Sequence, residues 1–309
     1  MSYTDTYLDS EDNIKLFLRT WRPHDQSKAV VHIVHGLSEH SRRYGALAEF
    51  LNTHGYTVVA HDQRGHGRTA GTGTIGLFAN TGGWQKVVDD VGRVQRHIGQ
   101  VFPSQAVFLL GHSMGSYVSQ AYLIRGDNNG LAGCILSGSN FGTPALFRLL
   151  RLIARLESWR QGIDGRSKLI NLLSFGAFNK AFKPNRTNFD WLSRDPQQVD
   201  KYINDPLCGQ LSTNQLWVDL MAGLIEITRV QNLKKIPAQL PVFIIGGERD
   251  PVSAGGRLTL LKNTLNKAGL QQVTLKLYPQ ARHEIFNETN RQQVYEDLLA
   301  WITAQLTAN

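Results

Sequence analysis

Short apolar segments alternate with segments of helical spacing over most of this sequence, and this alternation limits the fold more than any other feature. Apolar runs of strand length lie at residues 29–36, 56–62, 106–111, 131–138, 241–247 and 273–279. Helical spacing follows several of them, as in RRYGALAEFLNTHG and WQKVVDDVGRVQRHIGQVF. Strands that are apolar on both faces and are separated by helices form a parallel sheet with helices on both sides. We therefore predict an α/β fold.

The alternation is interrupted once. From Asn140 to Lys235 the sequence is mostly helical in pattern, rich in Leu, Phe and Arg, and it contains no convincing strand. A chain of 309 residues is long enough for one large domain with an insertion. We predict a core made of residues 1–139 and 236–309, with a helical insertion at 140–235. Near the start, YLDSEDNIKLFLRTW alternates polar and apolar residues around a turn, which is typical of a β-hairpin.

The segment GHSMG, residues 111–115, follows an apolar run and opens a helical pattern. It fits the pattern G-x-S-x-G, in which a serine on a sharp strand-to-helix turn exposes its hydroxyl at the carboxyl end of a sheet. Glycines suit this turn because they bring no Cβ atom close to the nucleophile. The alternative is an ordinary strand-to-helix turn in which Ser113 caps the helix. The sequence context favours a nucleophile.

A serine hydroxyl attacks only when a histidine removes its proton and an acid orients that histidine. On this kind of sheet the chain order is serine, acid, histidine. Of the ten histidines in the sequence, His283 is the one that follows Ser113, and it lies just after the last predicted strand. A surface-loop histidine is the alternative. Asp250 ends a strand at the same edge of the sheet, so we prefer it to Glu248 and Asp205 as the acid, although an ordinary turn also suits its position.

The oxyanion of an acyl-transfer reaction needs two backbone N–H donors. One belongs to the residue after the nucleophile, which is Met114, and the other to the loop after an early strand. That loop is HGLSEH, residues 35–40, in which Leu37 is placed to donate its N–H. A simple glycine turn is the alternative. This chemistry needs neither a metal ion nor a cofactor, and we predict none.

Five segments together resemble the monoacylglycerol lipase and lysophospholipase group of α/β-hydrolases. In chain order they are VHGLSEHSRRYGALAEFL, HDQRGHGRT, GHSMG, GGERDPV and RHEIFNE. The resemblance implies the α/β-hydrolase fold, with a mostly parallel sheet covered by helices on both faces and a helical cap over the site. It also implies that Ser113, Asp250 and His283 form a catalytic triad and that Leu37 and Met114 donate to the oxyanion.

The resemblance also bears on the substrate. In monoacylglycerol lipases the Glu and Arg of the EHSxRY stretch lie near the glycerol, and Glu39 and Arg43 stand at these positions here. A salt bridge within the loop is the alternative. Animal members carry a second histidine three residues after the catalytic one, where this chain has Phe286, which weakens a specific preference for monoglycerides. DPLC is similar to a family segment with a cysteine near the substrate pocket, although Cys208 need not be catalytic.

The insertion is strongly basic. Residues 148–186 contain 9 Lys or Arg against 2 Asp or Glu, in a chain whose net charge is +8. Within ALFRLLRLIARLESW one helical face carries Leu149, Leu152, Ile153 and Leu156, and another face carries Arg148, Arg151 and Arg155. Such a helix suits an anionic lipid surface and the admission of an acyl chain. The alternative is a cap helix that packs its leucines on the core and leaves its arginines in water.

Other features of the sequence bear on the cellular location of the protein and on its partners. No apolar run is long enough to span a bilayer, and the first residues do not resemble a signal peptide. The chain has two cysteines, Cys134 and Cys208, so a disulfide framework is not expected. No zinc finger, basic zipper or basic cluster interleaved with aromatic residues indicates a nucleic-acid partner. We predict a cytoplasmic protein, with peripheral membrane contact through the cap.

The sequence thus predicts a serine hydrolase that cleaves a carboxylic ester of an acyl lipid, either a monoacylglycerol or a lysophospholipid. The basic cap slightly favours the lysophospholipid because it would accept a phosphodiester. A short-chain carboxylesterase, a thioesterase and a peptidase remain alternatives, since the fold does not determine the leaving group. A binding protein on an inactive scaffold is disfavoured because every member of the site is present. Epoxide hydrolases and dehalogenases usually place Asp where this chain has Ser113.

Overall fold

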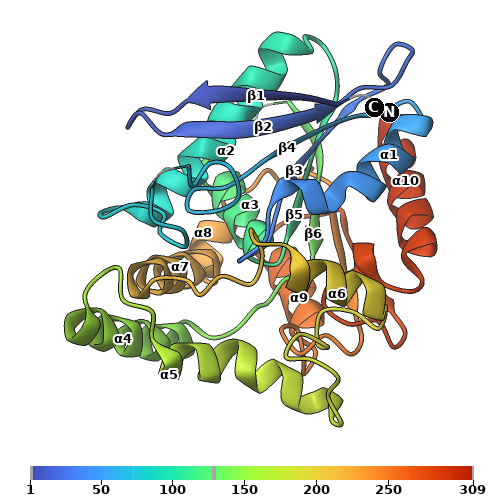
Figure 1. Ribbon diagram of the computed structural model, residues 1–309. Coiled ribbons are helices and arrows are strands. Elements are labelled where there is room, and N and C mark those ends of the chain that lie inside the picture. The colour runs from blue at the N-terminus through green and yellow to red at the C-terminus, as the bar shows by residue number, and fades with distance from the viewer. Residues whose placement is uncertain (1–2, 72, 127–129, 308–309) are drawn as a thin grey trace.

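An eight-stranded sheet forms the centre of the computed structural model, which describes residues 3–71, 73–126 and 130–307 (Figure 1). The strands are β1 (Tyr3–Asp9), β2 (Lys15–Trp21), β3 (Val30–Val34), β4 (Thr57–His61), β5 (Val107–His112), β6 (Leu131–Ser137), β7 (Val242–Gly247) and β8 (Val273–Tyr278). Their order in the sheet is β1-β2-β4-β3-β5-β6-β7-β8. All pairs from β4 to β8 are parallel. The prediction of a mostly parallel sheet is confirmed.

Helices cover both faces of this sheet. They are α1 (Gly45–Thr53), α2 (Gly83–Val101), α3 (Met114–Arg125), α9 (Arg257–Ala268) and α10 (Arg291–Thr307). Alternate residues of one strand face different helices: Leu109 of β5 packs with α2, α3 and α9, whereas Phe108 and Leu110 pack with α1 and α10. This two-residue period in a strand buried on both faces is the reason that the sequence shows a continuous apolar run there.

The predicted hairpin is formed by β1 and β2 and extends the sheet at one edge. Strand β2 runs antiparallel to β4, with Leu18 opposite His61. The buried Arg64 guanidinium attaches the hairpin to the core, because it donates hydrogen bonds both to Asp12 in the hairpin turn and to Asp90 in α2. The hairpin is therefore held by an ion pair as well as by backbone pairing.

The chain between β6 and β7, all of which is described, contains helical elements and no strand. The α-helices there are α4 (Pro144–Gln161), α5 (Lys168–Asn171), α6 (Pro196–Asn204), α7 (Asn214–Ile227) and α8 (Val230–Leu233). A π-helical turn at Leu172–Gly176 and a 3-10 turn at Asn179–Phe182 lie between α5 and α6. Helix α4 packs along α7, and α7 packs on α2 and α3. The apolar side chains of α7 therefore belong to the main core of the protein.

One predicted helix begins differently from the expectation. The helical pattern that begins at Arg42 belongs to a 3-10 turn at Ser41–Tyr44, and the chain becomes α-helical at Gly45. Tertiary contacts hold this turn, since the Ser41 N–H donates to Asp62 at 2.8 Å. Nowhere in the described part of the chain is a helix both long and apolar enough to cross a bilayer.

Candidate active site

Ser113 lies at the turn between β5 and α3, with a φ of 51° and a ψ of −120°. A positive φ is unfavourable for a residue with a Cβ atom and persists where the surroundings enforce it. The neighbouring glycines show how this turn is enforced: a Cβ on Gly115 would overlap the Val34 carbonyl oxygen, and a Cβ on Gly111 would overlap the Gly115 carbonyl oxygen. Although Ser113 occupies the N-cap position of α3, its side chain makes no capping hydrogen bond.

Asp250 and His283 come from the loops after β7 and β8. His283 Nδ1 lies 2.9 Å from Asp250 Oδ2, and both side chains are buried. The Asp250 carboxylate also accepts from the Val252 N–H at 2.9 Å and from the Ser253 hydroxyl at 3.2 Å. Its oxygens are thereby held in one orientation toward the histidine.

The other two acids considered from the sequence are placed elsewhere. Glu248 is exposed. Asp205 Oδ2 lies 3.0 Å from His40 Nε2, in a different pair. Of the three candidates, Asp250 is the one that contacts His283.

The electrostatics around His283 favour its cationic form. Burial acts to lower the pKa of His283, but the charge of Asp250 and the hydrogen bond with it outweigh burial, so that this pKa lies above its ordinary value. The His283 ring packs against Trp191 and His112, with ring centroids 5.1 and 4.8 Å away. Burial lowers the pKa of His112 to about 3. His112 is therefore neutral near pH 7 and brings no competing charge to His283.

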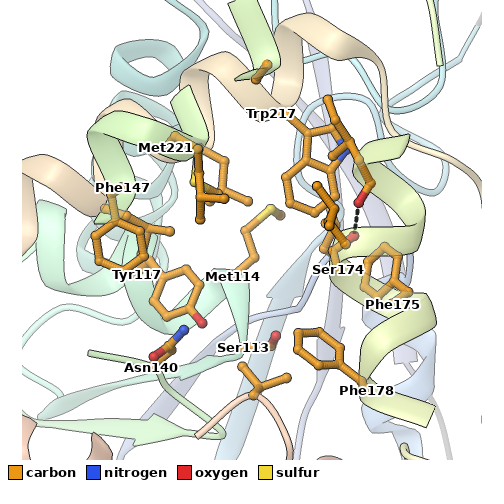
Figure 2. A pocket seen from close by; sticks show the side chains of 18 of the residues that line it. Ser113, Met114, Tyr117, Asn140, Phe147, Ser174, Phe175, Phe178, Trp217 and Met221 are labelled. Carbon is orange, nitrogen blue, oxygen red and sulfur yellow. Dashed lines mark hydrogen bonds between the residues drawn. The ribbon is translucent and has the colours of Figure 1, made fainter. Parts of the chain in front are cut away.

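A cavity of about 390 Å³ adjoins Ser113 (Figure 2). Figure 2 shows Phe175 and Phe178 on one side of Ser113, and Tyr117 and Asn140 on the other. Most of the lining is apolar and comes from the insertion, including Phe147, Leu150, Ile153, Ala154, Ile170, Leu173, Trp191, Trp217, Leu220, Met221 and Leu224. A cavity of this size and character suits an acyl chain or another apolar group.

Leu37 and Met114, the two residues expected to supply oxyanion donors, both line this cavity beside Ser113. Met114 is the first residue of α3, and the N–H groups of a first helical turn have no partner within the helix. The loop that contains Leu37 is braced by Glu39, whose Oε1 accepts from the Gly36 N–H at 2.6 Å.

Glu39 and Arg43 form a buried ion pair that includes a third residue, Glu284. Arg43 Nη1 lies 2.9 Å from Glu39 Oε2, and Arg43 Nη2 lies 2.6 Å from Glu284 Oε2. The Tyr44 hydroxyl donates to Glu39 Oε1 at 2.8 Å. Neither Glu39 nor Arg43 lines the cavity. The salt bridge stated above as the alternative is therefore present, and contact of Glu39 or Arg43 with the substrate stays a prediction.

The sequence reasoning did not identify Glu284, although its position next to His283 was a usable signal. Burial acts to raise the pKa of Glu284, but the Arg43 guanidinium outweighs it and holds this pKa below its ordinary value. The same balance lowers the pKa of Glu39. Two carboxylates therefore stay ionised on either side of one guanidinium. This guanidinium connects the loop of His283 with the loop that begins at Gly36.

Phe286 and Cys208, which the resemblance connected with the substrate, lie near the site but do not line the cavity. Phe286 is buried and packs against Tyr44 and Tyr295, with ring centroids 6.4 and 6.5 Å away. Cys208 is buried beside Trp191 and Val252, which do line the cavity. Burial raises the pKa of the Cys208 thiol above its ordinary value, so this cysteine is an unreactive thiol near pH 7.

The outer face of α4 is apolar and exposed. Leu149, Leu152 and Leu156 are 56%, 53% and 56% exposed, and Trp159 is 87% exposed. These leucines therefore do not pack on the core, in contrast to one of the two alternatives drawn from the sequence. Ile153, expected on the same face, lines the cavity instead. Helix α4 thus has an inner face toward the cavity and an apolar outer face toward solvent.

Comparisons with known proteins agree with this geometry. Residues 25–290 match the protein family described as "Serine aminopeptidase, S33". The monoacylglycerol lipase of Mycolicibacterium smegmatis is 26% identical over 300 residues, which cover 95% of this chain and 94% of that protein. The monoglyceride lipase of Homo sapiens is 28% identical over 308 residues, which cover 96% of this chain and 89% of that protein.

Solved structures share the whole fold. A thermostable carboxyl esterase from Bacillus coagulans, solved with glycerol, has a TM-score of 0.90 and 26% identity, and the match covers 99% of both chains. A soluble variant of the monoglyceride lipase of Saccharomyces cerevisiae, solved with a substrate analogue, has a TM-score of 0.77 and 21% identity over 99% of this chain and 97% of that one. The expected resemblance is confirmed, and the chain belongs to the serine aminopeptidase S33 family of α/β-hydrolases.

Proposed function

We propose that this protein is a serine hydrolase that cleaves the carboxylic ester of an acyl lipid, a monoacylglycerol or a lysophospholipid. The observation that carries the proposal is the position of Ser113, which stands on a strained turn and opens directly onto an apolar cavity. The buried pair of His283 and Asp250 supplies a base and the group that orients it. The names of the monoacylglycerol and monoglyceride lipase relatives support the same substrate class.

In the proposed mechanism, His283 Nε2 removes the proton of the Ser113 hydroxyl as Oγ attacks the ester carbonyl carbon. The negative oxygen of the tetrahedral intermediate accepts hydrogen bonds from the N–H groups of Leu37 and Met114. The bond to the alcohol then breaks, and His283 gives its proton to the leaving oxygen. Water attacks the acyl-enzyme while His283 takes a proton from it. That proton returns to Ser113 Oγ as the fatty acid leaves.

The cavity favours an acyl ester over a peptide as the substrate. An aminopeptidase must recognise a charged α-amino group, for which a carboxylate is the natural partner. The described residues that line the cavity include no Asp or Glu, and aromatic and aliphatic side chains dominate. An acyl chain can bury against these side chains and gain about 0.8 kcal/mol for each methylene.

Active-site labelling tests whether Ser113 is the nucleophile. A fluorophosphonate should label the wild-type protein covalently and should not label Ser113→Ala. Ser158→Ala, which changes a serine on α4 outside the cavity lining, is the matched control and should be labelled like the wild type. A wild-type protein that remains unlabelled would remove the basis of the proposal.

Hydrolysis rates separate the substrates. We expect kcat/KM for 1-oleoylglycerol and for 1-oleoyl lysophospholipids to exceed that for p-nitrophenyl acetate, because the acetyl group leaves most of the cavity empty. A labelled protein that prefers the acetyl ester, an acyl thioester or a peptide would instead be the short-chain esterase, the thioesterase or the peptidase named above.

We further propose that residues 140–235 act as a cap that contacts lipid surfaces through α4. The exposed leucines and Trp159 provide an apolar face, and the same helix carries Arg148 and Arg155 in exposed positions. An apolar face bordered by basic residues suits the interface of an anionic membrane. Because the inner face of α4 lines the cavity, a substrate held in the membrane would be next to its binding site.

A further inference from the structure

Arg257 is the one charged side chain among the described residues that line the cavity. It stands at the first position of α9, with Gly256 as the N-cap, and the first turn of this helix contains no acidic residue. A helix N-terminus carries a partial positive charge, so that its effect adds to that of the guanidinium. The positive potential at this end of the cavity is therefore not offset within α9.

No carboxylate in the described part of the chain pairs with Arg257. Its Nη1 donates to Asn140 Oδ1 at 3.0 Å, which is a bond to a neutral amide. The nearby acid in sequence is Asp250, but its oxygens are occupied by His283, Val252 and Ser253. Arg257 is half-buried, so its guanidinium is partly withdrawn from water while its recorded partner is a neutral amide. Arg257 thus has unused capacity for an anion.

Tyr117 is a second and independent indication of a ligand at this position. The residue is 6% exposed and lines the cavity, and its hydroxyl makes no hydrogen bond to another described residue. Figure 2 shows the Tyr117 hydroxyl beside Asn140, on the side of Ser113 opposite Phe178. Since the Asn140 oxygen accepts from Arg257, its amide N–H₂ group remains a donor. Three donors therefore gather at one end of an otherwise apolar cavity.

We propose that Arg257, Asn140 and Tyr117 form a subsite for a phosphate group carried by the leaving alcohol, so that the preferred substrate is a lysophospholipid. A guanidinium can donate two parallel hydrogen bonds to a phosphate, and the phenol and amide each add one. The glycerol of a monoacylglycerol is neutral and would cover the guanidinium without balancing its charge. The aromatic part of the cavity, with Phe175 and Phe178, then receives the acyl chain. This inference rests on the proposed esterase function and specifies its substrate.

The test compares substrates that share an acyl chain and differ in charge. The values of kcat/KM for 1-oleoyl lysophosphatidic acid, 1-oleoyl lysophosphatidylglycerol and 1-oleoylglycerol are measured in the same neutral detergent. In the wild type the ratio of the anionic to the neutral substrate should exceed one. In Arg257→Ala this ratio should fall about 10-fold or more, as expected for the loss of hydrogen bonds between charged groups. Arg257→Lys should retain part of the ratio, and Tyr117→Phe should lower it by a smaller factor.

Arg96→Ala is the matched control. It removes the same charge from an exposed position on α2, away from both the cavity lining and α4, and should leave the ratio unchanged. Glycerol 3-phosphate, glycerol and inorganic phosphate are then compared as inhibitors of p-nitrophenyl butyrate hydrolysis. Stronger inhibition by glycerol 3-phosphate supports recognition of a headgroup. Equal inhibition by inorganic phosphate, without a preference for the anionic lipids, would indicate a free-phosphate site and overturn the proposal.

The outcomes also separate this inference from the esterase function. If the wild type hydrolyses all three lipids and Arg257→Ala lowers every rate by the same factor, the phosphate subsite is wrong and the esterase function stands. If the wild type hydrolyses none of them and no fluorophosphonate labels Ser113, the proposed function itself fails.

Discussion

The pairing of His283 with Asp250 determines how the rate should depend on pH. A base must be neutral to accept a proton, and the carboxylate raises the pKa of His283 above 6.5. We therefore expect kcat/KM to fall as the pH drops through a value above 6.5. Asp250→Asn should move this acid limb to lower pH and reduce kcat by about 10⁴-fold. The pH profile of p-nitrophenyl butyrate hydrolysis measures both effects.

The exposed Glu248 provides the comparison for that experiment. Glu248→Gln removes a carboxylate two residues away along the chain and should leave both the pH profile and kcat unchanged. An Asp250→Asn variant whose acid limb stays at the wild-type pH would show that another group sets the pKa of the base.

Arg43 should matter more to stability than to substrate binding. Replacing it by Met leaves Glu39 and Glu284 buried next to each other without a cation, and breaking such a pair costs about 3–5 kcal/mol. The free energy of unfolding in urea should fall by this amount at pH 7.5. The difference from the wild type should become smaller at lower pH, where the two carboxylates of the variant can be protonated. Arg42→Met changes the exposed neighbour and should leave stability within about 0.5 kcal/mol of the wild type.

Single residues differ in how far the sequence predicts them. Ser113, Asp250 and His283 could be proposed because each follows a strand and parallel strands end at one edge. The pairing of Arg43 with Glu284 depends on how two loops separated by about 240 positions meet, and no local pattern encodes that meeting. The orientation of Arg257 into the cavity is hidden for the same reason.

The contact between α3 and the sheet depends on a glycine. The missing side chain at Gly115 lets the start of α3 lie against the Val34 carbonyl. In Gly115→Ala the helix must move away from β3, which carries Ser113 away from the oxyanion donors. We expect loss of fluorophosphonate labelling together with a lower thermal midpoint. Gly99→Ala, inside α2 with no atom near its Cβ, should instead retain labelling and be stabilised slightly. Normal labelling of Gly115→Ala would contradict this account of the turn.

The outer face of α4 should control binding to membranes. Replacing Leu152 and Leu156 together by Asp removes two apolar contacts, each worth about 1.5–3 kcal/mol when fully buried. Flotation with liposomes that contain phosphatidylglycerol should show at least about 10-fold weaker binding. The wild type should bind these liposomes less well in high salt, which screens the arginines. Leu260→Asp changes an exposed leucine of α9. This variant is the control and should float like the wild type. Equal flotation of all variants would contradict the membrane role of α4.

Secondary-structure elements were predictable where the spacing of apolar residues agreed with the glycines and turn residues that end helices and strands. The strands of the sheet and helices α2, α3, α9 and α10 follow the apolar pattern closely. The 3-10 turn at Ser41–Tyr44 was missed because a tertiary bond to Asp62 holds it. Within the insertion the helical character was clear, but the boundaries of its elements were not. Some apolar residues of the insertion line the cavity, some are exposed to solvent and some pack in the core. Their spacing therefore does not mark a single buried face.

The molecule as a whole should lose stability in mild acid because it buries several neutral histidines. Burial lowers the pKa of five of them, with His32 at about 3, His66 at about 4, and His35, His61 and His112 also below 6.5. Below pH 6.5 these histidines bind protons in the unfolded chain but stay neutral in the folded protein. Each such histidine therefore removes about 1.4 kcal/mol per pH unit. His283 has the opposite sign, since its raised pKa gives stability that is present below 6.5 and is lost as the pH rises through that pKa.

Urea unfolding at closely spaced pH values measures the net effect. The five histidines with a lowered pKa outweigh His283, so the free energy of unfolding should fall steeply from pH 7 to pH 5. His24→Gln, which changes an exposed histidine, should give the same slope as the wild type. A free energy of unfolding that stays constant over this range would contradict the burial of neutral histidines.

The attachment of α7 to α2 and α3 has a mechanical consequence for the cap. Helix α3 begins next to Ser113, so a motion of the entire insertion would pull on the nucleophile through α7. Helix α4, by contrast, ends at Gln161 and touches the rest of the molecule chiefly along α7. We expect α7 to stay fixed to the core while α4 moves along it. Substrate would then enter as α4 slides over α7, and this movement would leave the position of Ser113 unchanged.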